Sequence, residues 1–361
     1  MKQKIVIIAV CLIIAFVFGM VFIYFSKINK DVDIKEDVSV IFSKGEAKGR
    51  IALKNEGARK AEVRVALVPF NQSRDDLPIY FYFDDSYPLV LTSVNAYLGL
   101  YNFLTSDLAE KNIQNTIQIV DAKGLVEKMG DGKSIIIMSS GILPDTVYSK
   151  DKNLVTQWLE SGGIMFWLGD GFGYYSAAEG REIKDDSEHG KIGWEGQEKI
   201  LGKNYLFGEV FEPVEKSLAD TATQIAQALG LKYRYITTGA VMSELARNNA
   251  SSIGFNKNIN DNFGRSSISF IPVGKGRLIL FGSGILEKQR DVSWDITQII
   301  SSNLIFASYP EAKYENVTLE PKASKVIDLK IITKDAKGAT VLIFNDKNEV
   351  NYFYAKVFNN S

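Results

Sequence analysis

Apolar and polar residues alternate with different periods along this chain, and the pattern divides it into four parts. Residues 5–25 are 21 consecutive residues without a charge. Residues 31–76 and 310–361 carry short runs in which apolar and polar residues alternate, the pattern of half-buried β-strands. Residues 77–309 alternate nearly continuous apolar runs with amphipathic stretches, which is typical of strands and helices in turn.

The two flanking segments predict a small all-β domain. Before the middle segment, "VSVIFS", "GRIALK" and "AEVRVALVPF" are strand-like, and four further β runs follow residue 310. In "AEVRVALVPF", Val63, Val65 and Leu67 alternate with more polar residues, so we expect one buried face. Residues 31–76 and 310–361 therefore suit one sandwich-like domain with the middle segment inserted, and two separate β pieces are the alternative.

The middle segment, residues 77–309, predicts an α/β domain with a parallel sheet covered by helices on both faces. A compact helix is expected over 151–162, with Asp151 capping its start and Gly162-Gly163 ending it. The apolar strand 164–170 follows. The expected fold class is thus α/β, with an N-terminal transmembrane helix and a sandwich-like domain beside the parallel sheet.

Two stretches carry a resemblance to a known family. "VTQWLESGGIMFWLGD" and "GKGRLILFGSG" with its closing helix resemble the class I glutamine amidotransferase-like fold, a flavodoxin-like sheet, and are similar to its trehalose-utilisation-type branch. Active members place a Cys on the elbow after the strand, with a His and a Glu downstream. Gly171 stands at that position here, while Cys11 and His189 are the only Cys and His. The resemblance therefore implies a catalytically degenerate domain, a pseudoenzyme with no catalytic residue and no cofactor.

The combination of parts is also similar to the 48-kilodalton-type subunit of oligosaccharyltransferase, which joins such a domain to β domains and one membrane helix. That resemblance implies an accessory subunit of a membrane or glycan-processing complex. The expected partners are other membrane protein subunits and a glycan. The net charge of -1 gives no electrostatic case for nucleic acid.

The uncharged segment 5–25 is long enough to cross a bilayer core of about 30 Å as a helix. Lys2 and Lys4 precede it and favour a cytoplasmic N-terminus. We therefore expect residues 1–30 to be a cytoplasmic stub and a signal anchor of a single-pass protein of the cell membrane, with the body on the outer face. Glycosylation sequons begin at four positions, Asn71, Asn249, Asn316 and Asn359.

Ligand-binding candidates are expected at the carboxyl ends of the parallel strands. Polar residues and a glycine follow three of these strands, namely Asp84, Asp85, Ser139, Ser140, Asp170 and Gly171, and Ser283 follows a fourth. Such residues also cap helices and turns. The three carboxylates could instead hold a hard cation, or Asp84 or Asp85 could work with Asp170 as an acid/base pair on a glycan. Tyr174 and Tyr175 either stack on a sugar or pack beneath the segment that follows.

The sequence thus favours a non-catalytic, extracytoplasmic binding or scaffold protein. The alternative is a carbohydrate-active hydrolase that uses the carboxylates beside the strand ends. The geometry of those carboxylates separates the two: a pair about 5 to 10 Å apart in an open cleft favours the hydrolase. Carboxylates bonded to backbone amides favour the binding protein.

Overall fold

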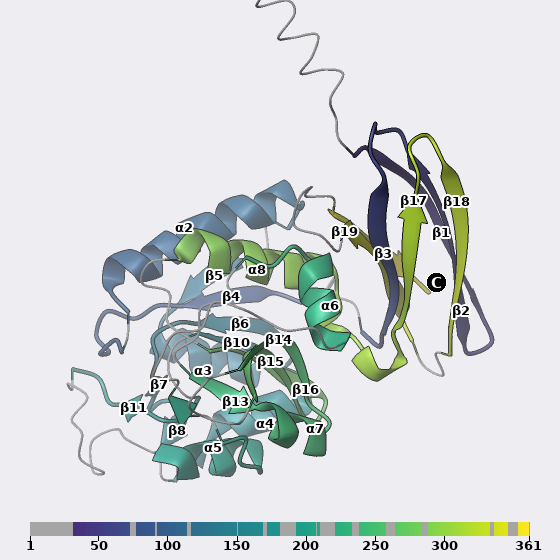
Figure 1. Cartoon of the computed structure of the whole chain (residues 1–361). Helices are drawn as coiled ribbons and strands as arrows, with labels where there is room; N and C mark the ends of the chain where they lie inside the picture. Colours follow the sequence, from purple (N-terminus) through teal and green to yellow (C-terminus); the bar gives the residue numbers. More distant parts are fainter. Residues whose placement is uncertain are drawn as a thin grey trace, which may run out of the picture.

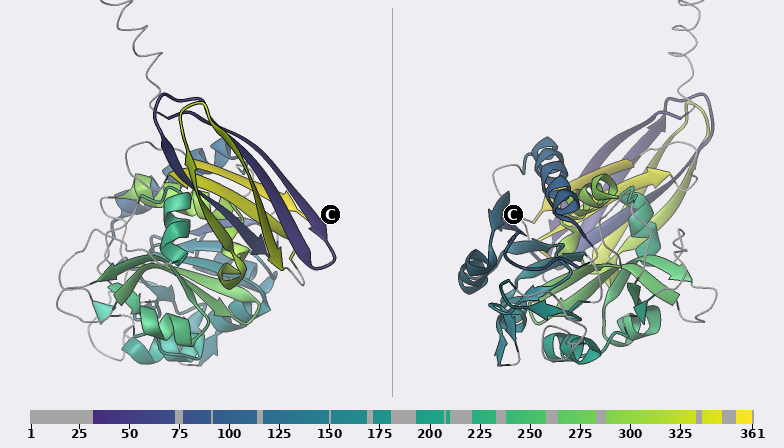
Figure 2. Two further views of the ribbon diagram at one scale, coloured as in Figure 1. Left: turned by 45° about the vertical axis from the view of Figure 1, so that its right-hand side comes forward. Right: turned by 90° about the vertical axis from the view of Figure 1, so that its left-hand side faces the viewer.

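The computed structural model describes residues 32–72, 77–90, 92–113, 117–149, 151–168, 172–180, 193–206, 208–209, 221–232, 238–257, 264–282, 288–332, 336–345 and 353–360. Within these residues an antiparallel β-sandwich lies against one side of a larger sheet that carries helices on both faces (Figures 1 and 2).

The sandwich draws its strands from both flanking segments of the sequence. One sheet has the order β1-β2-β18 and the other β17-β3-β19-β20, and every strand pair in both is antiparallel. The strands are β1 (Ile34–Ser43), β2 (Glu46–Asn55), β3 (Ala61–Phe70), β17 (Lys313–Leu319), β18 (Ser324–Ile332), β19 (Gly338–Asn345) and β20 (Phe353–Asn359). Segments on either side of the middle region therefore share hydrogen-bonded sheets.

Strand β3 is buried on both faces along its second half. Val65 and Leu67, two of the residues predicted to share a buried face, are 0% exposed and lie in the sandwich core. Ala66, Val68 and Phe70 on the opposite face are at most 1% exposed, and they belong to the core of the helix-covered sheet. The expected single buried face is therefore incomplete, because the second face of β3 packs against the other unit.

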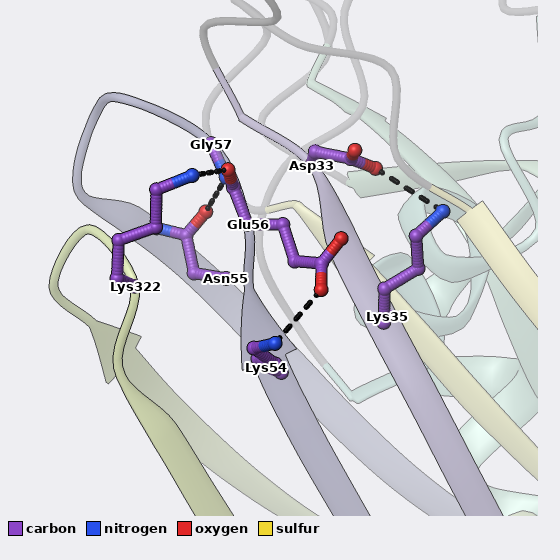
Figure 3. A network of polar contacts seen from close by, with 7 residues as sticks. All are labelled: Asp33, Lys35, Lys54, Asn55, Glu56, Gly57 and Lys322. Carbon is purple, nitrogen blue, oxygen red and sulfur yellow. Dashed lines mark hydrogen bonds and ion pairs between the residues drawn. The ribbon is translucent and has the colours of Figure 1, made fainter.

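A buried asparagine joins the two flanking segments at one end of the sandwich (Figure 3). Asn55 is 0% exposed, and its Nδ2 donates to the carbonyl of Leu319 at 3.2 Å. Its Oδ1 accepts the N–H of Gly57 at 2.9 Å. Beside it, the Lys322 ammonium donates to the carbonyl of Glu56. One side chain thus satisfies a nearby backbone N–H and a backbone carbonyl that lies 264 positions further along the chain.

Within the described residues the larger sheet has nine strands and mixes both directions. Its main path is β12-β13-β15-β16-β10-β6-β4-β5, and β14 also pairs with β15. The pairs β4–β5, β4–β6, β6–β10 and β10–β16 are parallel, and the pairs among β12, β13, β14, β15 and β16 are antiparallel. The strands are β4 (Ile79–Tyr82), β5 (Ile117–Val120), β6 (Ile135–Met138), β10 (Ile164–Leu168), β12 (Gly208–Glu209), β13 (Thr238–Val241), β14 (Ser251–Lys257), β15 (Gly264–Val273) and β16 (Gly276–Phe281).

The prediction of a parallel-sheet, flavodoxin-like fold is therefore wrong. Most sheets of this chain are antiparallel or mixed, since the sandwich is antiparallel throughout and the larger sheet turns antiparallel beyond β16. The physical reason is that a continuous apolar run indicates a strand buried on both faces, but it does not indicate whether the strand runs parallel or antiparallel to its neighbours. The turn at Gly274 and Lys275 reverses the chain between β15 and β16, so these two strands must run antiparallel.

Helices cover both faces of this sheet, and the sheet separates two hydrophobic cores, one under each layer of helices (Figure 1). Along β4, Ile79 and Phe81 face one core and Tyr80 and Tyr82 the other. The helices are α2 (Val94–Glu110), α3 (Ala122–Gly130), α4 (Leu154–Ser161), α5 (Gly193–Leu201), α6 (Thr221–Ala228), α7 (Met242–Arg247) and α8 (Gln289–Ser301). Short 3-10 turns η2 (Leu304–Phe306) and η3 (Tyr309–Glu311) and short strands β7 (Leu143–Pro144), β8 (Tyr148–Ser149), β9 (Lys152–Asn153) and β11 (Ser176–Ala177) complete the elements.

Helix α4 begins later than its pattern predicts. Asn153, and not Asp151, caps it, because the Asn153 side chain accepts the N–H of Thr156 at 3.0 Å. The helix ends at Gly162, whose φ of 120° is a backbone conformation that favours glycine.

The predicted membrane segment, residues 5–25, lies outside the described residues. In the part of the chain that the structure describes, no helix is long and apolar enough to cross a membrane. The longest of these helices, α2, has 17 residues and spans about 25 Å. The described residues therefore give no support to the predicted transmembrane helix, the single-pass signal anchor or the location at the outer face of the cell membrane, and we do not propose them further.

We expect Asn55→Ala to lower the free energy of unfolding by about 2 kcal/mol, because the buried N–H of Gly57 and carbonyl of Leu319 lose their partner. Urea denaturation of the full chain measures the change. Glu56→Gln is the control: it removes only the exposed ion pair with Lys54 at 2.9 Å, so its urea midpoint stays with the wild type. Equal shifts for both variants would contradict a special role for Asn55.

Candidate functional site

The strand order places the candidate site beside β4 and β6. The chain runs from β4 to β5 on one side and returns to β6, β10 and β16 on the other. Ligands of sheets with this reversal bind outside the carboxyl ends of the strands, where the order changes direction. The described residues there are 83–90, 139–147 and 172–180, which we call the rim.

Asp84 is bonded through both carboxylate oxygens to its own neighbourhood. Its Oδ1 accepts the N–H of Ser86 at 3.0 Å and the Ser86 hydroxyl at 2.5 Å. Its Oδ2 accepts the N–H of Ala122, the first residue of α3, at 3.0 Å. Asp84 therefore forms the turn after β4 and holds the start of α3 to it.

These bonds determine the charge of Asp84. Partial burial by itself would raise the pKa of this carboxyl. The hydrogen bonds from the Ser86 hydroxyl, the Ala122 N–H and the Ser86 N–H outweigh burial and hold the pKa below the ordinary range of aspartate. The group is ionised at neutral pH and is unsuited to act as a general acid, which requires a raised pKa.

The other candidates after β4 and β6 lie at different depths. Asp85 is exposed. Ser139 and Ser140 are each 1% exposed, so both lie beneath the rim and not on its surface. The Ser140 hydroxyl donates to the carbonyl of Ile142 at 2.9 Å and so shapes the turn that follows β6.

Backbone hydrogen bonds join the rim loops to one another. The donors and acceptors come from the loops after β4 and β6 and from the segment around β11. The bonds are Val90 N–H to Ser140 at 2.9 Å, Leu143 N–H to Tyr175 at 3.0 Å, Asp145 N–H to Ala177 at 2.9 Å and Gly180 N–H to Ser86 at 2.7 Å. Three segments far apart in sequence thus form one connected surface over the strand ends.

Tyrosines contribute both to this surface and to its support. Tyr174 and Tyr175 are partly buried and meet edge to face, with ring centroids 4.8 Å apart. The Tyr87 hydroxyl donates to Asp145 Oδ1 at 2.9 Å. Burial, and then this bond to a carboxylate, raise the pKa of Tyr87, so it stays a neutral donor. Sequence reasoning missed the pair because its members are 58 residues apart.

Several predicted residues lie outside the described part of the chain. They are Asp170, Gly171, His189, Cys11 and Ser283. Among the described residues, no group of three or more His, Cys, Asp or Glu side chains is placed to hold a metal ion. The four sequon residues Asn71, Asn249, Asn316 and Asn359 are all exposed.

Comparisons with known proteins leave the family open. No family model matches the chain, and no curated protein matches it. Similar solved structures include a β-galactosidase from Rahnella sp. R3, at 12% identity and a TM-score of 0.37, which covers 71% of this chain and 41% of the enzyme. A cytoplasmic protein of Salmonella typhimurium LT2 is 13% identical with a TM-score of 0.31, over 64% of this chain and 100% of that one.

An exo-β-1,4-mannosidase from Opitutaceae bacterium strain TAV5 is 12% identical, with a TM-score of 0.34, over 64% of this chain and 35% of the enzyme. This chain spans less than half the length of either glycosidase. Likenesses of this strength carry no argument about activity. The resemblance to amidotransferase-like domains is not tested by them and stays a prediction.

We expect Asp84→Asn to destabilise the fold by about 1–3 kcal/mol. The carboxylate accepts hydrogen bonds through both of its oxygens, whereas an amide would turn its NH₂ group toward one of these donors and leave that donor without a partner. Since the folded pKa of Asp84 is lowered, its contribution is complete above the unfolded value of about 3.9 and is lost as the pH falls below that value. The difference in unfolding free energy between wild type and Asp84→Asn should therefore be constant from neutral pH down to that value and shrink further below.

Urea denaturation at a series of pH values checks this prediction, and Asp85→Asn is the matched control on the exposed neighbour. A similar loss of stability in both variants, or no change with pH for Asp84→Asn, would contradict the structural role of Asp84.

Proposed function

We propose that this chain is a non-catalytic binding or scaffold module that presents its rim to a partner in a larger assembly. The observation that carries the proposal is the state of Asp84, a carboxylate in the turn that follows β4. Both of its oxygens hold backbone or hydroxyl groups of the chain itself. A carboxylate used in this way is a part of the scaffold and is not available to a substrate.

The electrostatics of the rim support the same proposal. Glycoside hydrolysis needs one carboxyl with a raised pKa as the acid and a second as base or nucleophile. The pKa of Asp84 is lowered. Ser139 and Ser140, the neighbouring hydroxyls, are buried and cannot reach a ligand without a rearrangement of the loops.

The surface above these residues is suited to contact. The loops are fixed by four backbone hydrogen bonds, so binding pays little for ordering them. Asp85 is exposed on this surface, and the partly exposed Tyr174 adds an aromatic ring. An accessory role in a glycan-processing assembly is one form of this proposal, which needs a partner of that kind to be found.

The first experiment asks whether the rim binds a partner. The full chain is affinity-purified from its native cells, and proteins that accompany it in stoichiometric amounts are quantified by mass spectrometry. We expect the amount of partner that co-purifies with Asp85→Arg to fall at least about tenfold. Asp37→Arg, at an exposed position on β1, should retain the wild-type amount. Equal retention by both variants would contradict the rim as the binding face.

A second measurement separates binding from catalysis. The purified chain is incubated with a panel of chromogenic glycosides, beside Asp84→Asn and Asp85→Asn. We expect no turnover above that of buffer. Turnover by the wild type that falls in a folded Asp85→Asn or Asp84→Asn variant would overturn the proposal in favour of a hydrolase.

A further inference from the structure

A cavity lies at the opposite edge of the larger sheet from the rim, where the two units meet. Its volume is about 140 Å³. It lies between the end of β3, the first residues of β10 and β16, and η2. Because β10 and β16 are parallel, their amino ends share this edge and their carboxyl ends share the rim. The cavity is therefore a separate place in the fold.

Among the described residues, the lining of the cavity includes two cations and no carboxylate. Lys275 lies in the turn between β15 and β16 and is exposed, while Arg277 is the second residue of β16 and is partly buried. Asn71 and Gln72 add two amide side chains. Ile305, 1% exposed, and Phe306, 7% exposed, give it an apolar wall.

Arg277 is poorly compensated by the chain. One guanidinium nitrogen donates to the carbonyl of Ala307 at 3.3 Å, and Cζ lies 5.9 Å from the centroid of the Phe270 ring. Within the described residues no ion pair joins Arg277 to a carboxylate. Burial lowers the pKa of Arg277, but a guanidinium stays charged at neutral pH. A partly buried charge without a counter-charge has lost part of its hydration, so an anion bound beside Arg277 would be stabilised.

We propose that this cavity binds a small organic carboxylate. The planar fork of Arg277 matches a carboxylate through two parallel hydrogen bonds, and Lys275 at the mouth adds a second positive charge. The amides of Asn71 and Gln72 can donate to the remaining lone pairs, and Ile305 and Phe306 contact a short apolar tail. At roughly 30 Å³ per water molecule, the volume suits a ligand of about five heavy atoms. This inference does not rest on the proposed function of the rim.

The test is calorimetric titration of the full chain with acetate, propionate, butyrate and, separately, inorganic phosphate. We expect saturable binding of butyrate with a dissociation constant near 1 mM, tighter than acetate because of the apolar wall, and weaker binding of phosphate. A tripeptide with a free C-terminus and its C-terminal amide distinguish a free acid from a protein terminus as the source of the carboxylate.

Variants assign the binding to this cavity. Arg277→Met should abolish binding and leave the fold intact, because methionine keeps an apolar stem like that of this partly buried side chain and removes only the charge. Lys275→Ala, at the exposed mouth, should weaken binding at least about threefold. Because the Lys275 side chain is exposed, this variant should be as stable as the wild type. Arg247→Met, an exposed cation on α7, is the matched control and should bind as the wild type does.

Two outcomes would overturn the proposal. The first is no saturable binding of any carboxylate, and the second is binding that Arg277→Met retains. In the first case a further variant gives the reason, since Asp75 and Asp76 follow Gln72 closely in the sequence and lie outside the described residues. Binding of butyrate by D75N/D76N would then show that the carboxylate of this site belongs to the chain itself.

Discussion

The burial of strand β3 on both faces is the constraint on which the rest of the structure depends. One face of β3 completes the sandwich core, and the other closes the core formed by the larger sheet and its helices. Strand β19 pairs with β3 and behaves in the same way, since Val341 and Ile343 face the sandwich while Leu342 and Phe344 face the helices. The two units therefore share a wall and are packed as one body.

This shared wall explains why the two edges of the larger sheet differ. At the carboxyl ends of the parallel strands the loops close over the sheet by bonding to one another. At the amino ends, β10 and β16 meet the end of β3 and η2, elements that belong to the junction with the sandwich. Junctions between units pack less completely than the interior of one unit, and a cavity at such a place is a common position for a ligand.

Asp84 and Arg277 are charged residues beside the same sheet, and they differ in how well the chain satisfies their charge. Asp84 is partly buried and receives three hydrogen bonds, so its ionised form is favoured by the fold. Arg277 is also partly buried, but the described residues give its guanidinium one long hydrogen bond and a contact with the Phe270 ring, and no carboxylate. A satisfied charge is part of the scaffold, whereas a poorly satisfied one is a place where a ligand can lower the free energy.

The sequence by itself indicated strands and helices such as β3 and α4, and one buried face in each of them. The apolar faces of β3 and α4 follow from periods of 2 and 3.6, because burial of one face is a local property of the pattern. The pattern did not determine strand direction, because a run such as 164–168 is apolar whether its neighbours run parallel or antiparallel. Only the tertiary structure paired β2 with β18, joined Tyr87 to Asp145 and placed Arg277 beside the end of β3. Those contacts depend on where distant segments meet in space, and no periodicity within a segment records that.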